Sequence, residues 1–219
     1  MAEDGGVSIE PDPVVDSRAV LWSSRPEELA TRPLLLLLHG VGAHEGDLFA
    51  LSPQLPLEPV IASLRAPLPY GGGWSWFELG TPIDPKSEGV DGAARAVLAW
   101  LDALDPAPPW IGLLGFSQGG AVAMQLLRHA PTRFAFVVQL SGFVMSGELP
   151  GDAELEALRP PVFWGRGNQD PIIPAEAIEH TTQWLPSHSS VDVRIYEGMG
   201  HAVSGPEIGD IAAFIRRQH

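Results

Sequence analysis

Ser117 is the residue whose setting most clearly indicates chemistry. It lies at the centre of the pentapeptide Gly-Phe-Ser-Gln-Gly, residues 115–119, which has the form Gly-x-Ser-x-Gly. The apolar run 110–114 precedes it, and the helix-forming run 120–127 follows it. This context predicts a tight strand-to-helix turn that exposes the serine hydroxyl near the free N–H groups of a helix N-terminus. We therefore expect Ser117 to be a nucleophile; the alternative is a glycine-rich turn with an incidental serine.

His201 is the expected base of the site, because a serine hydroxyl needs a base to remove its proton and an acid to orient that base. It lies in the glycine-containing loop 197–201, directly after an alternating run at 190–196 that is typical of a strand. The alternative is an ordinary histidine on a surface loop. The other downstream histidines are expected on helices, in a polar turn or at the chain end: His129, His180, His188 and His219.

Asp170 is the expected acid, since in this kind of site the acid lies between the serine and the histidine along the chain. It ends a loop after a short apolar strand at 161–165, and the carboxyl ends of such strands are where open α/β sheets build their sites. Its alternative role is that of a turn aspartate before proline. Asp152 has no strand before it, and Asp192 is expected to face solvent from within a strand.

Two backbone N–H groups are expected to stabilise the oxyanion of a tetrahedral intermediate. One belongs to Gln118, directly after the serine, and the other should come from the loop after an earlier strand. The five leucines at 34–38 are that strand, and the loop after them reads His-Gly-Val-Gly. We assign the second donor to Val41, and we expect His39 to brace the loop rather than to act as a second base.

The segment 70–77 combines four aromatic residues with three glycines and should begin at the end of the sheet that carries the site. We expect at least one of its last two residues, Trp76 and Phe77, to anchor the segment to the core. Trp74, next to the glycines, is the expected apolar wall for a substrate chain. Two further aromatic residues are expected to contact the substrate: Phe116 and Phe143.

Taken together, these motifs resemble the phospholipase/carboxylesterase branch of the α/β hydrolases, which includes acyl-protein thioesterases and small bacterial carboxylesterases. The resemblance implies a small-molecule carboxylic ester or thioester substrate and no cofactor. Two departures concern Arg166, where relatives often carry histidine, and the glycine-rich stretch 70–74, which looks more like the bacterial esterases. The matching stretches cover nearly the whole chain in the expected order: 38–42, 64–67, 76–77, 115–120, 170–174 and 200–201.

Length and composition indicate one globular domain, expected at 14–219 after a loose acidic segment at 1–13. The chain has 219 residues and is 45% hydrophobic, which is enough for a sizeable core. Its formal charge of −14, from 27 acidic and 13 basic residues, disfavours nucleic acid and anionic membranes as partners. The absence of cysteine excludes disulfides and a cysteine nucleophile.

The start of the chain lacks the basic region and apolar core of a secretory signal. The run of five leucines is far too short to span a bilayer. A cytoplasmic protein without stable membrane insertion is therefore the expectation. The sequence leaves the oligomeric state open, with a homodimer among the options.

The order of elements predicts a single-domain α/β hydrolase fold, with a mainly parallel sheet covered by helices on both faces. Helices are expected at 88–104, after the serine, at 174–185 and at the C-terminus, and the first and last of these carry an apolar stripe. The segment 141–159 should hold a short acidic helix at most, so no large lid is expected. Strands are expected at 18–23, 33–38, 59–65, 109–115, 134–140, 161–165 and 190–196.

The sequence thus predicts a serine carboxylesterase that works through an acyl-enzyme intermediate. A thioesterase or a lysophospholipase could use the same residues. An α/β hydrolase fold that binds a small ligand without catalysis is the alternative outside the enzymes. No internal repeat and no spacing typical of metal ligands is present.

Overall fold

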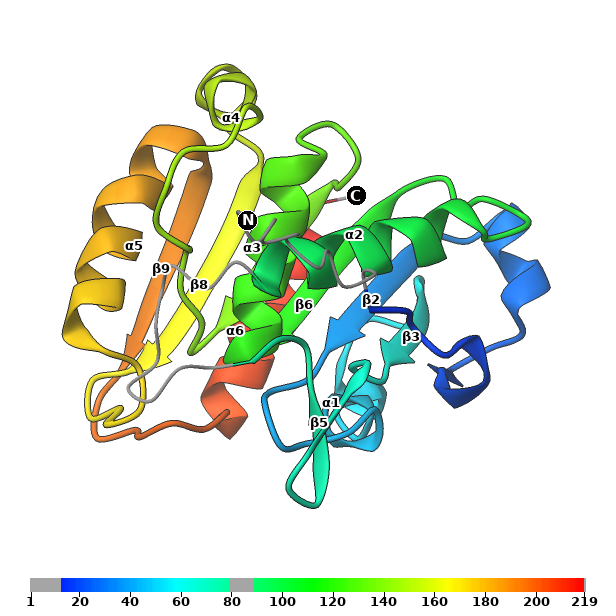
Figure 1. Cartoon of the computed structure of the whole chain (residues 1–219), viewed down its shortest axis with the longest axis horizontal. Coiled ribbons are helices and arrows are strands. Elements are labelled where there is room, and N and C mark those ends of the chain that lie inside the picture. Colours follow the sequence, from blue (N-terminus) through cyan, green and yellow to red (C-terminus); the bar gives the residue numbers. More distant parts are fainter. Residues whose placement is uncertain (1–12, 79–88, 219) are drawn as a thin grey trace, which may run out of the picture.

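The computed structural model describes residues 13–78 and 89–218. A seven-stranded sheet forms its centre, and only the first edge strand runs antiparallel to its neighbour. Figure 1 shows the strands side by side. In spatial order they are β1 (Leu21–Trp22), β3 (Val60–Leu64), β2 (Leu34–Leu38), β6 (Ile111–Phe116), β7 (Phe136–Leu140), β8 (Pro161–Gly167) and β9 (Ser190–Tyr196).

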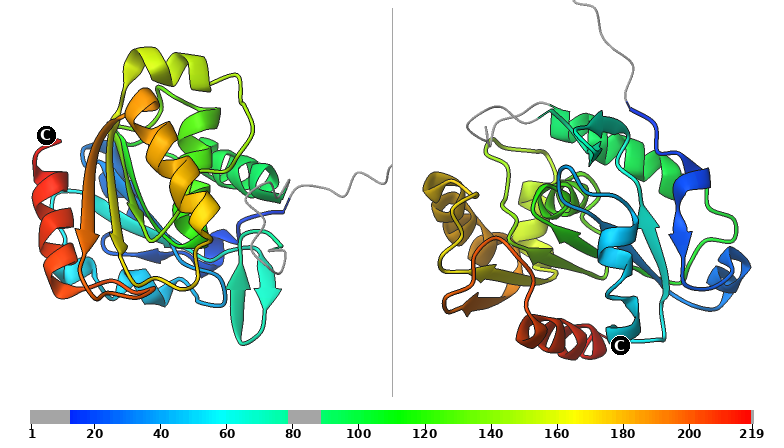
Figure 2. Two further views of the ribbon diagram at one scale, coloured as in Figure 1. Left: turned by 90° about the vertical axis from the view of Figure 1, so that its left-hand side faces the viewer. Right: turned by 90° about the horizontal axis from the view of Figure 1, so that it is seen from below.

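Helices cover both faces of this sheet, as Figure 2 shows edge-on. One face packs against α2 (Gly89–Asp102), α3 (Gln118–His129) and α5 (Ala175–His188). The other packs against α6 (Gly205–Arg216) and the single turn α1 (Gly46–Phe49). The remaining helices are α4 (Asp152–Leu158) and three 3₁₀ helices, η1 (Ser17–Ala19), η2 (Pro26–Ala30) and η3 (Ser52–Gln54).

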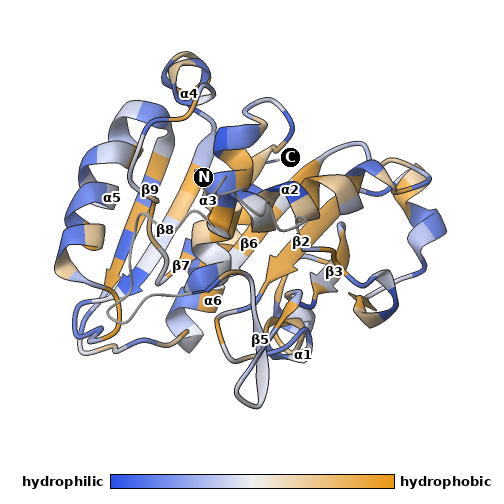
Figure 3. Ribbon diagram, viewed as in Figure 1, coloured by the Kyte–Doolittle hydropathy of each residue, from blue (hydrophilic) through white to orange (hydrophobic). Residues whose placement is uncertain are grey.

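The run of five leucines in β2 shows why the sequence forms a central parallel strand. All five side chains are fully buried, because alternate residues of a strand point to opposite faces and both faces are covered here. Leu34, Leu36 and Leu38 join the core beneath α2 and α3, whereas Leu35 and Leu37 join the core beneath α6. In Figure 3 the ribbons of β2 and β6 are mainly orange, the colour of hydrophobic residues, whereas α5 is mainly blue to white.

The expected mainly parallel α/β architecture is confirmed, and the differences are local. The first strand is only two residues long, because η1 occupies the residues before it. α5 continues to His188, one turn beyond the expected end, since Pro186 lies in its last turn and removes only one helical hydrogen bond. Residues 1–12 of the expected loose segment 1–13, and the expected helix start at 88, lie outside the described residues.

A two-stranded hairpin, which the sequence analysis did not predict, projects from the carboxyl end of the sheet (Figure 1). Its strands are β4 (Leu68–Tyr70) and β5 (Gly73–Ser75), which pair antiparallel. The segment was expected near the site end of the sheet, but without regular secondary structure. In the structure, its position beside the loop after β2 makes it part of the surroundings of the site.

In the part of the chain that the structure describes, no helix has both the length and the apolar character needed to cross a bilayer.

Candidate active site

Ser117 lies on a strained turn between β6 and α3. Its backbone has φ 54° and ψ −117°, a conformation that residues other than glycine adopt rarely and mostly at functional sites. The turn needs glycine on both sides: a Cβ on Gly115 would lie 2.2 Å from the carbonyl oxygen of Gly119, and one on Gly119 would lie 2.0 Å from that of Leu38. The strand-to-helix turn expected from the Gly-x-Ser-x-Gly pattern is therefore present.

The structure brings Ser117, His201 and Asp170 into one hydrogen-bonded chain. His201 Nδ1 lies 2.7 Å from Asp170 Oδ2, and His201 Nε2 lies 2.8 Å from Ser117 Oγ. Because a carboxylate can only accept, Nδ1 carries the proton, and Nε2 is then free to accept the serine hydroxyl hydrogen. The side chains of Asp170 and His201 are only 3% and 16% exposed. Such an arrangement is chemically suited to activating a serine hydroxyl, with the imidazole as the base and the carboxylate orienting it.

Backbone N–H groups of the next turn hold the Asp170 carboxylate. Its Oδ1 accepts from the N–H of Ile172 at 2.9 Å and of Ile173 at 3.4 Å, which leaves Oδ2 for His201. The sequence Asp-Pro-Ile-Ile-Pro therefore forms a turn around its own aspartate.

The loops that carry Asp170 and His201 are also joined to each other. The Asn168 amide donates to Glu197 Oε2 at 2.8 Å and accepts from the N–H of Gly198 at 2.8 Å. The N–H of Gln169 donates to the carbonyl oxygen of Met199 at 3.0 Å. These bonds fix the separation of two loops that are about thirty residues apart in the chain, and single-sequence patterns contained no sign of them.

His39 has the bracing role that the sequence predicted for it. Its Nε2 accepts from the N–H of Ala66 at 3.1 Å, so its proton is on Nδ1, which donates to the carbonyl oxygen of Gly40 at 2.7 Å. Burial lowers the pKa of His39, which favours the neutral ring. Because a trans peptide is planar, fixing the Gly40 carbonyl turns the N–H of Val41 in the opposite direction, away from the His39 ring.

The N–H of Gln118 is oriented by the first turn of α3. The carbonyl oxygen of Ser117 accepts from the N–H of Ala121 at 3.1 Å, as in a regular helix. The N–H of Gln118, at the other end of the same peptide plane, therefore points out of the helix N-terminus. Val41 and Gln118 both line the cavity in front of Ser117.

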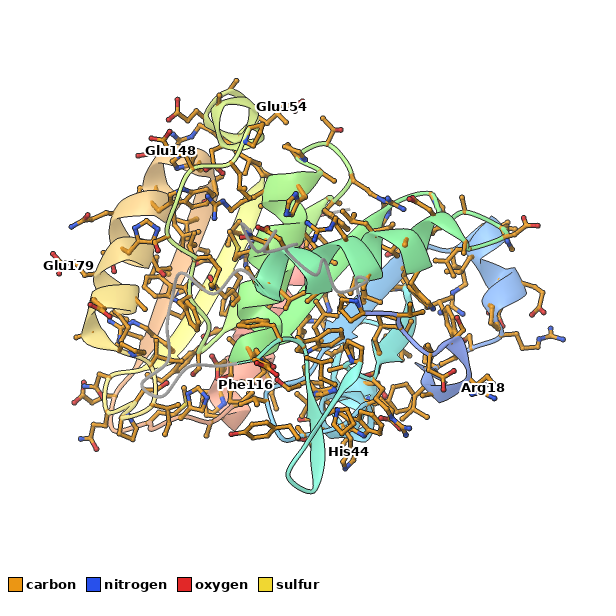
Figure 4. The ribbon with its side chains drawn as sticks, viewed as in Figure 1. Arg18, His44, Phe116, Glu148, Glu154 and Glu179 are labelled. Atoms are coloured by element: carbon orange, nitrogen blue, oxygen red, sulfur yellow. The ribbon has the colours of Figure 1, made fainter. Side chains whose placement is uncertain are left out.

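The cavity at Ser117 has a volume of about 190 Å³ and mainly apolar walls. Among the described residues it is lined by no carboxylate, lysine or arginine. In Figure 4 the labelled Phe116 lies centrally at the end of β6, whereas Glu148, Glu154 and Glu179 lie at the periphery around α4 and α5. The residues that line the cavity are Gly40, Val41, Phe116, Ser117, Gln118, Phe143, Ile172 and His201.

Two of the three expected substrate contacts lie in this cavity and one does not. Phe116 and Phe143 line it, and the Phe116 ring centroid is 4.9 Å from that of His201. Trp74 is not among the lining residues; the guanidinium of Arg65 lies 4.9 Å from its ring centroid instead. Pairing of Trp74 with Ala43 holds its backbone beside the loop after β2, and its role as an apolar wall for a substrate chain stays a prediction.

Ile172 is a cavity residue that the sequence analysis missed. It is 50% exposed and follows the Asp-Pro pair on the loop after β8. An apolar residue on a loop at the carboxyl end of a strand, directly after the expected acid, was the available signal. The anchoring role expected for Trp76 and Phe77 is met by both, since they are 0% and 1% exposed.

Four of the six alternative bases and acids have partners elsewhere in the structure. His129 Nε2 lies 2.6 Å from Asp91, and the His188 ring stacks on Trp184 at 3.9 Å. His180 lies on α5, and His219 is outside the described residues. Asp152 forms a buried ion pair with Arg128 at 2.7 Å, and Asp192 pairs with two arginines: Arg194 and Arg217. Over 13–78 and 89–218, no group of three or more histidine, aspartate or glutamate residues could hold a metal ion.

Behind the site, Glu207 ends the His201 loop with a capping box at the start of α6. Its N–H donates to Ser204 Oγ at 3.3 Å, and its Oε2 accepts from the N–H of Ser204 at 3.3 Å. The side chain is buried against Gly165, where a Cβ would lie 2.2 Å from Oε1. Burial, with a smaller contribution from the charge of Asp210, raises the pKa of Glu207 to about 7.

This raised pKa predicts that stability falls as the pH rises from about 4.5 to 7. In that range native Glu207 keeps a proton that the unfolded chain has lost, so the native state binds more protons and deprotonation favours unfolding. Glu207→Gln keeps an acceptor for the Ser204 N–H without the charge. We expect it to raise Tm at pH 8 by several degrees, corresponding to on the order of 3 kcal/mol, with little change at pH 4.5.

Thermal unfolding at both pH values measures this difference, and Glu179→Gln on the exposed face of α5 is the control. A gain of equal size at the two pH values would show that the charge of Glu207 is not its cause.

The chain was compared with known proteins. A family model described as phospholipase/carboxylesterase matches residues 24–219. Acyl-protein thioesterase 1 of Kluyveromyces lactis is 28% identical over 207 residues, covering 84% of this chain and 91% of that protein. Carboxylesterase SOBER1 of Arabidopsis thaliana is 27% identical over 214 residues, covering 85% of this chain and 91% of that protein.

Solved structures share the fold. Esterase PE8 has a TM-score of 0.77 at 24% identity and covers 94% of this chain and 100% of its own. The Bacillus cereus carboxylesterase has a TM-score of 0.75 at 22% identity and covers 91% of this chain and 94% of its own.

Proposed function

The chain belongs to the phospholipase/carboxylesterase family of α/β hydrolases, and we propose on that premise that its ester hydrolysis runs through Ser117, His201 and Asp170. The protein is a serine hydrolase of carboxylic esters. The observation that supports the proposed residues most directly is the unbroken hydrogen-bonded chain from Ser117 Oγ through His201 to Asp170 at an apolar cavity. Val41 and Gln118 supply the proposed oxyanion donors.

In the first half of the proposed reaction, Ser117 Oγ attacks the acyl carbon while its proton passes to His201 Nε2. Asp170 holds the imidazole with its other proton on Nδ1 and stabilises the imidazolium that forms. The N–H groups of Val41 and Gln118 stabilise the negative charge that develops on the carbonyl oxygen. When the carbon–oxygen or carbon–sulfur bond breaks, His201 returns the proton to the leaving alcohol or thiol, and the acyl group stays on Ser117.

In the second half, water repeats the cycle on the acyl-enzyme. His201 takes a proton from the attacking water, and the hydroxide adds to the acyl carbon. Collapse of the second tetrahedral intermediate breaks the bond to Ser117 Oγ, which takes the proton back from His201. The carboxylic acid leaves, and the chain Ser117–His201–Asp170 is restored.

Substrate assays on the whole chain test this proposal. p-Nitrophenyl acetate and butyrate, the thioester with the same butyryl group and a lysophospholipid cover the oxoester, thioester and phospholipid possibilities. We expect turnover of at least the oxoesters and covalent labelling of Ser117 by a fluorophosphonate probe. The thioester arm is included because the Kluyveromyces lactis relative is a thioesterase. A protein that is neither labelled nor active on any arm would be a ligand-binding fold without catalysis.

Phe116, Phe143 and Ile172 are proposed to contact the acyl or alcohol chain, and Ile172 offers the sharpest test because half its surface is exposed. Ile172→Ala removes apolar wall while its N–H can still donate to Asp170. We expect it to lower kcat/KM for the butyrate about threefold to tenfold more than for the acetate.

Val193→Ala on β9 is the matched control, since Val193 is a 43% exposed aliphatic residue that does not line the cavity. Equal losses on both esters for Ile172→Ala, with an unchanged Tm, would remove Ile172 from the substrate site.

A further inference from the structure

We propose that residues 73–77 form a bridge that holds the two oxyanion donors in register, with the Gln118 carboxamide as a positioning group. This inference rests on the proposed function, because it assigns a role toward the donors named above. The bridge begins at β5 and runs directly into the core. Its side chains at positions 75, 76 and 77 are at most 2% exposed.

One end of the bridge is bonded to the loop that carries Val41. The N–H of Gly42 donates to the carbonyl oxygen of Trp74 at 2.8 Å, and the N–H of Trp74 donates to that of Ala43 at 2.9 Å. The two backbones approach so closely that a Cβ on Gly73 would lie 2.1 Å from the Gly42 carbonyl oxygen. Glycine at position 73 is therefore needed for this contact, whatever side chain stands at position 74.

The other end of the bridge is bonded to the side chain of Gln118. Its Oε1 accepts from the N–H of Trp76 at 2.9 Å, and its Nε2 donates to the carbonyl oxygen of Phe77 at 2.7 Å and to Ser75 Oγ at 3.0 Å. Gln118 is 2% exposed, so these bonds form where water does not compete. Gln118 thus offers one donor through its backbone N–H, and its side chain is hydrogen-bonded to the segment that positions the other donor, the N–H of Val41.

A third contact links the middle of the bridge to the same loop. The indole N–H of Trp76 donates to the carbonyl oxygen of His39 at 2.8 Å, and the His39 ring in turn fixes the Gly40 carbonyl. The bridge therefore meets the loop after β2 on both sides of Val41. Its buried, hydrogen-bonded backbone gives it little freedom to shift without moving that loop.

This arrangement matters because oxyanion stabilisation depends on donors that are already in place before the charge develops. Removing one donor typically costs about 10²–10³-fold in kcat, and displacing a donor should cost part of that. None of the bridge residues 73–77 is among those that line the cavity. A defect in the bridge should therefore lower kcat and leave KM nearly unchanged.

Gly73→Ala tests the first end, and its neighbour supplies a matched control. A Cβ on Gly73 would collide with the Gly42 backbone, whereas one on Gly72 would meet nothing within 4 Å. We expect Gly73→Ala to lower kcat for p-nitrophenyl acetate about 10- to 100-fold, with KM within about threefold of wild type. Gly72→Ala should keep the wild-type kcat.

Gln118→Met tests the other end without changing the backbone N–H of that residue. Its control is Gln125→Met on the same helix, because Gln125 is also buried, at 3% exposure, and also bonded through both ends of its amide, to Asp91 and Arg128. Both variants should lose stability, but only Gln118→Met should lose kcat, again about 10- to 100-fold. Combined with Gly73→Ala, the loss should be smaller than the product of the two single losses, because both act on one bridge.

The rate of Ser117 labelling by the fluorophosphonate should fall together with kcat in both bridge variants. Wild-type kcat in Gln118→Met, or equal losses in Gln118→Met and Gln125→Met, would overturn the inference. So would an effect confined to KM. Failure of the proposed function looks different, since it would appear as an inert wild type or as activity that survives Ser117→Ala. If Gly73→Ala does not fold, the Gln118 arm decides.

Discussion

Ser117→Ala is expected to lower kcat by roughly 10⁴-fold or more, because no other hydroxyl occupies the position in front of His201 Nε2 in the described structure. His201→Ala should cost a similar factor, since the serine then has no base at 2.8 Å. The double variant should be little worse than either single one, because the two residues act as a unit. Turnover of p-nitrophenyl acetate and fluorophosphonate labelling measure both effects.

Matched controls come from the same molecule. Ser141 is a buried serine at the end of the neighbouring strand β7, and its backbone φ is also positive, at 44°. Ser141→Ala should keep kcat. His129, the last residue of α3, is bonded to Asp91, and His129→Ala is the control for His201→Ala. If Ser117→Ala kept substantial activity with a native Tm, the nucleophile would have to be sought elsewhere in the chain.

Asp170→Asn is the second change with a large expected effect, again a loss of about 10⁴-fold in kcat with little change in Tm. An amide that presents its NH₂ to His201 Nδ1 favours the tautomer with the proton on Nε2. That tautomer cannot accept the proton of Ser117, so the nucleophile is not activated even though the geometry of the three residues is kept. Steady-state kinetics and thermal unfolding of the same preparation measure both parts of the prediction.

Two other aspartates separate this effect from a general loss of acidic groups. Asp192→Asn should leave kcat unchanged, because Asp192 pairs with arginines on the edge strand β9. Asp152→Asn should lower Tm and spare kcat, since it weakens a buried pair with Arg128. The assignment of the acid would be wrong if Asp170→Asn kept near wild-type turnover while either of these two variants lost it.

Local patterns in the sequence were sufficient for the architecture and for the elements that carry the site. The five leucines of β2 predict a strand covered on both faces without any knowledge of its partners. Glycines on both sides of Ser117 predict a turn too tight for larger residues, and the backbone shows that turn. The placement of Asp170 and His201 followed from one rule, that loops after parallel strands meet at the same edge of the sheet.

What decided the rest was contact between segments far apart in the chain. The Trp74 indole was expected at the pocket because it stands beside conformationally free glycines, whereas its observed neighbours come from distant parts of the same chain: its backbone pairs with Ala43, and the guanidinium of Arg65 lies 4.9 Å from its ring centroid. The hydrogen bonds of the buried Gln118 amide, and those between the Asp170 and His201 loops, could not be predicted from the sequence either. Periodicity and turn chemistry depend on neighbours within a few residues, so the sequence by itself determines elements and their order. Which backbone lies against which loop depends on long-range packing and hydrogen-bond geometry, and only the tertiary structure decides it.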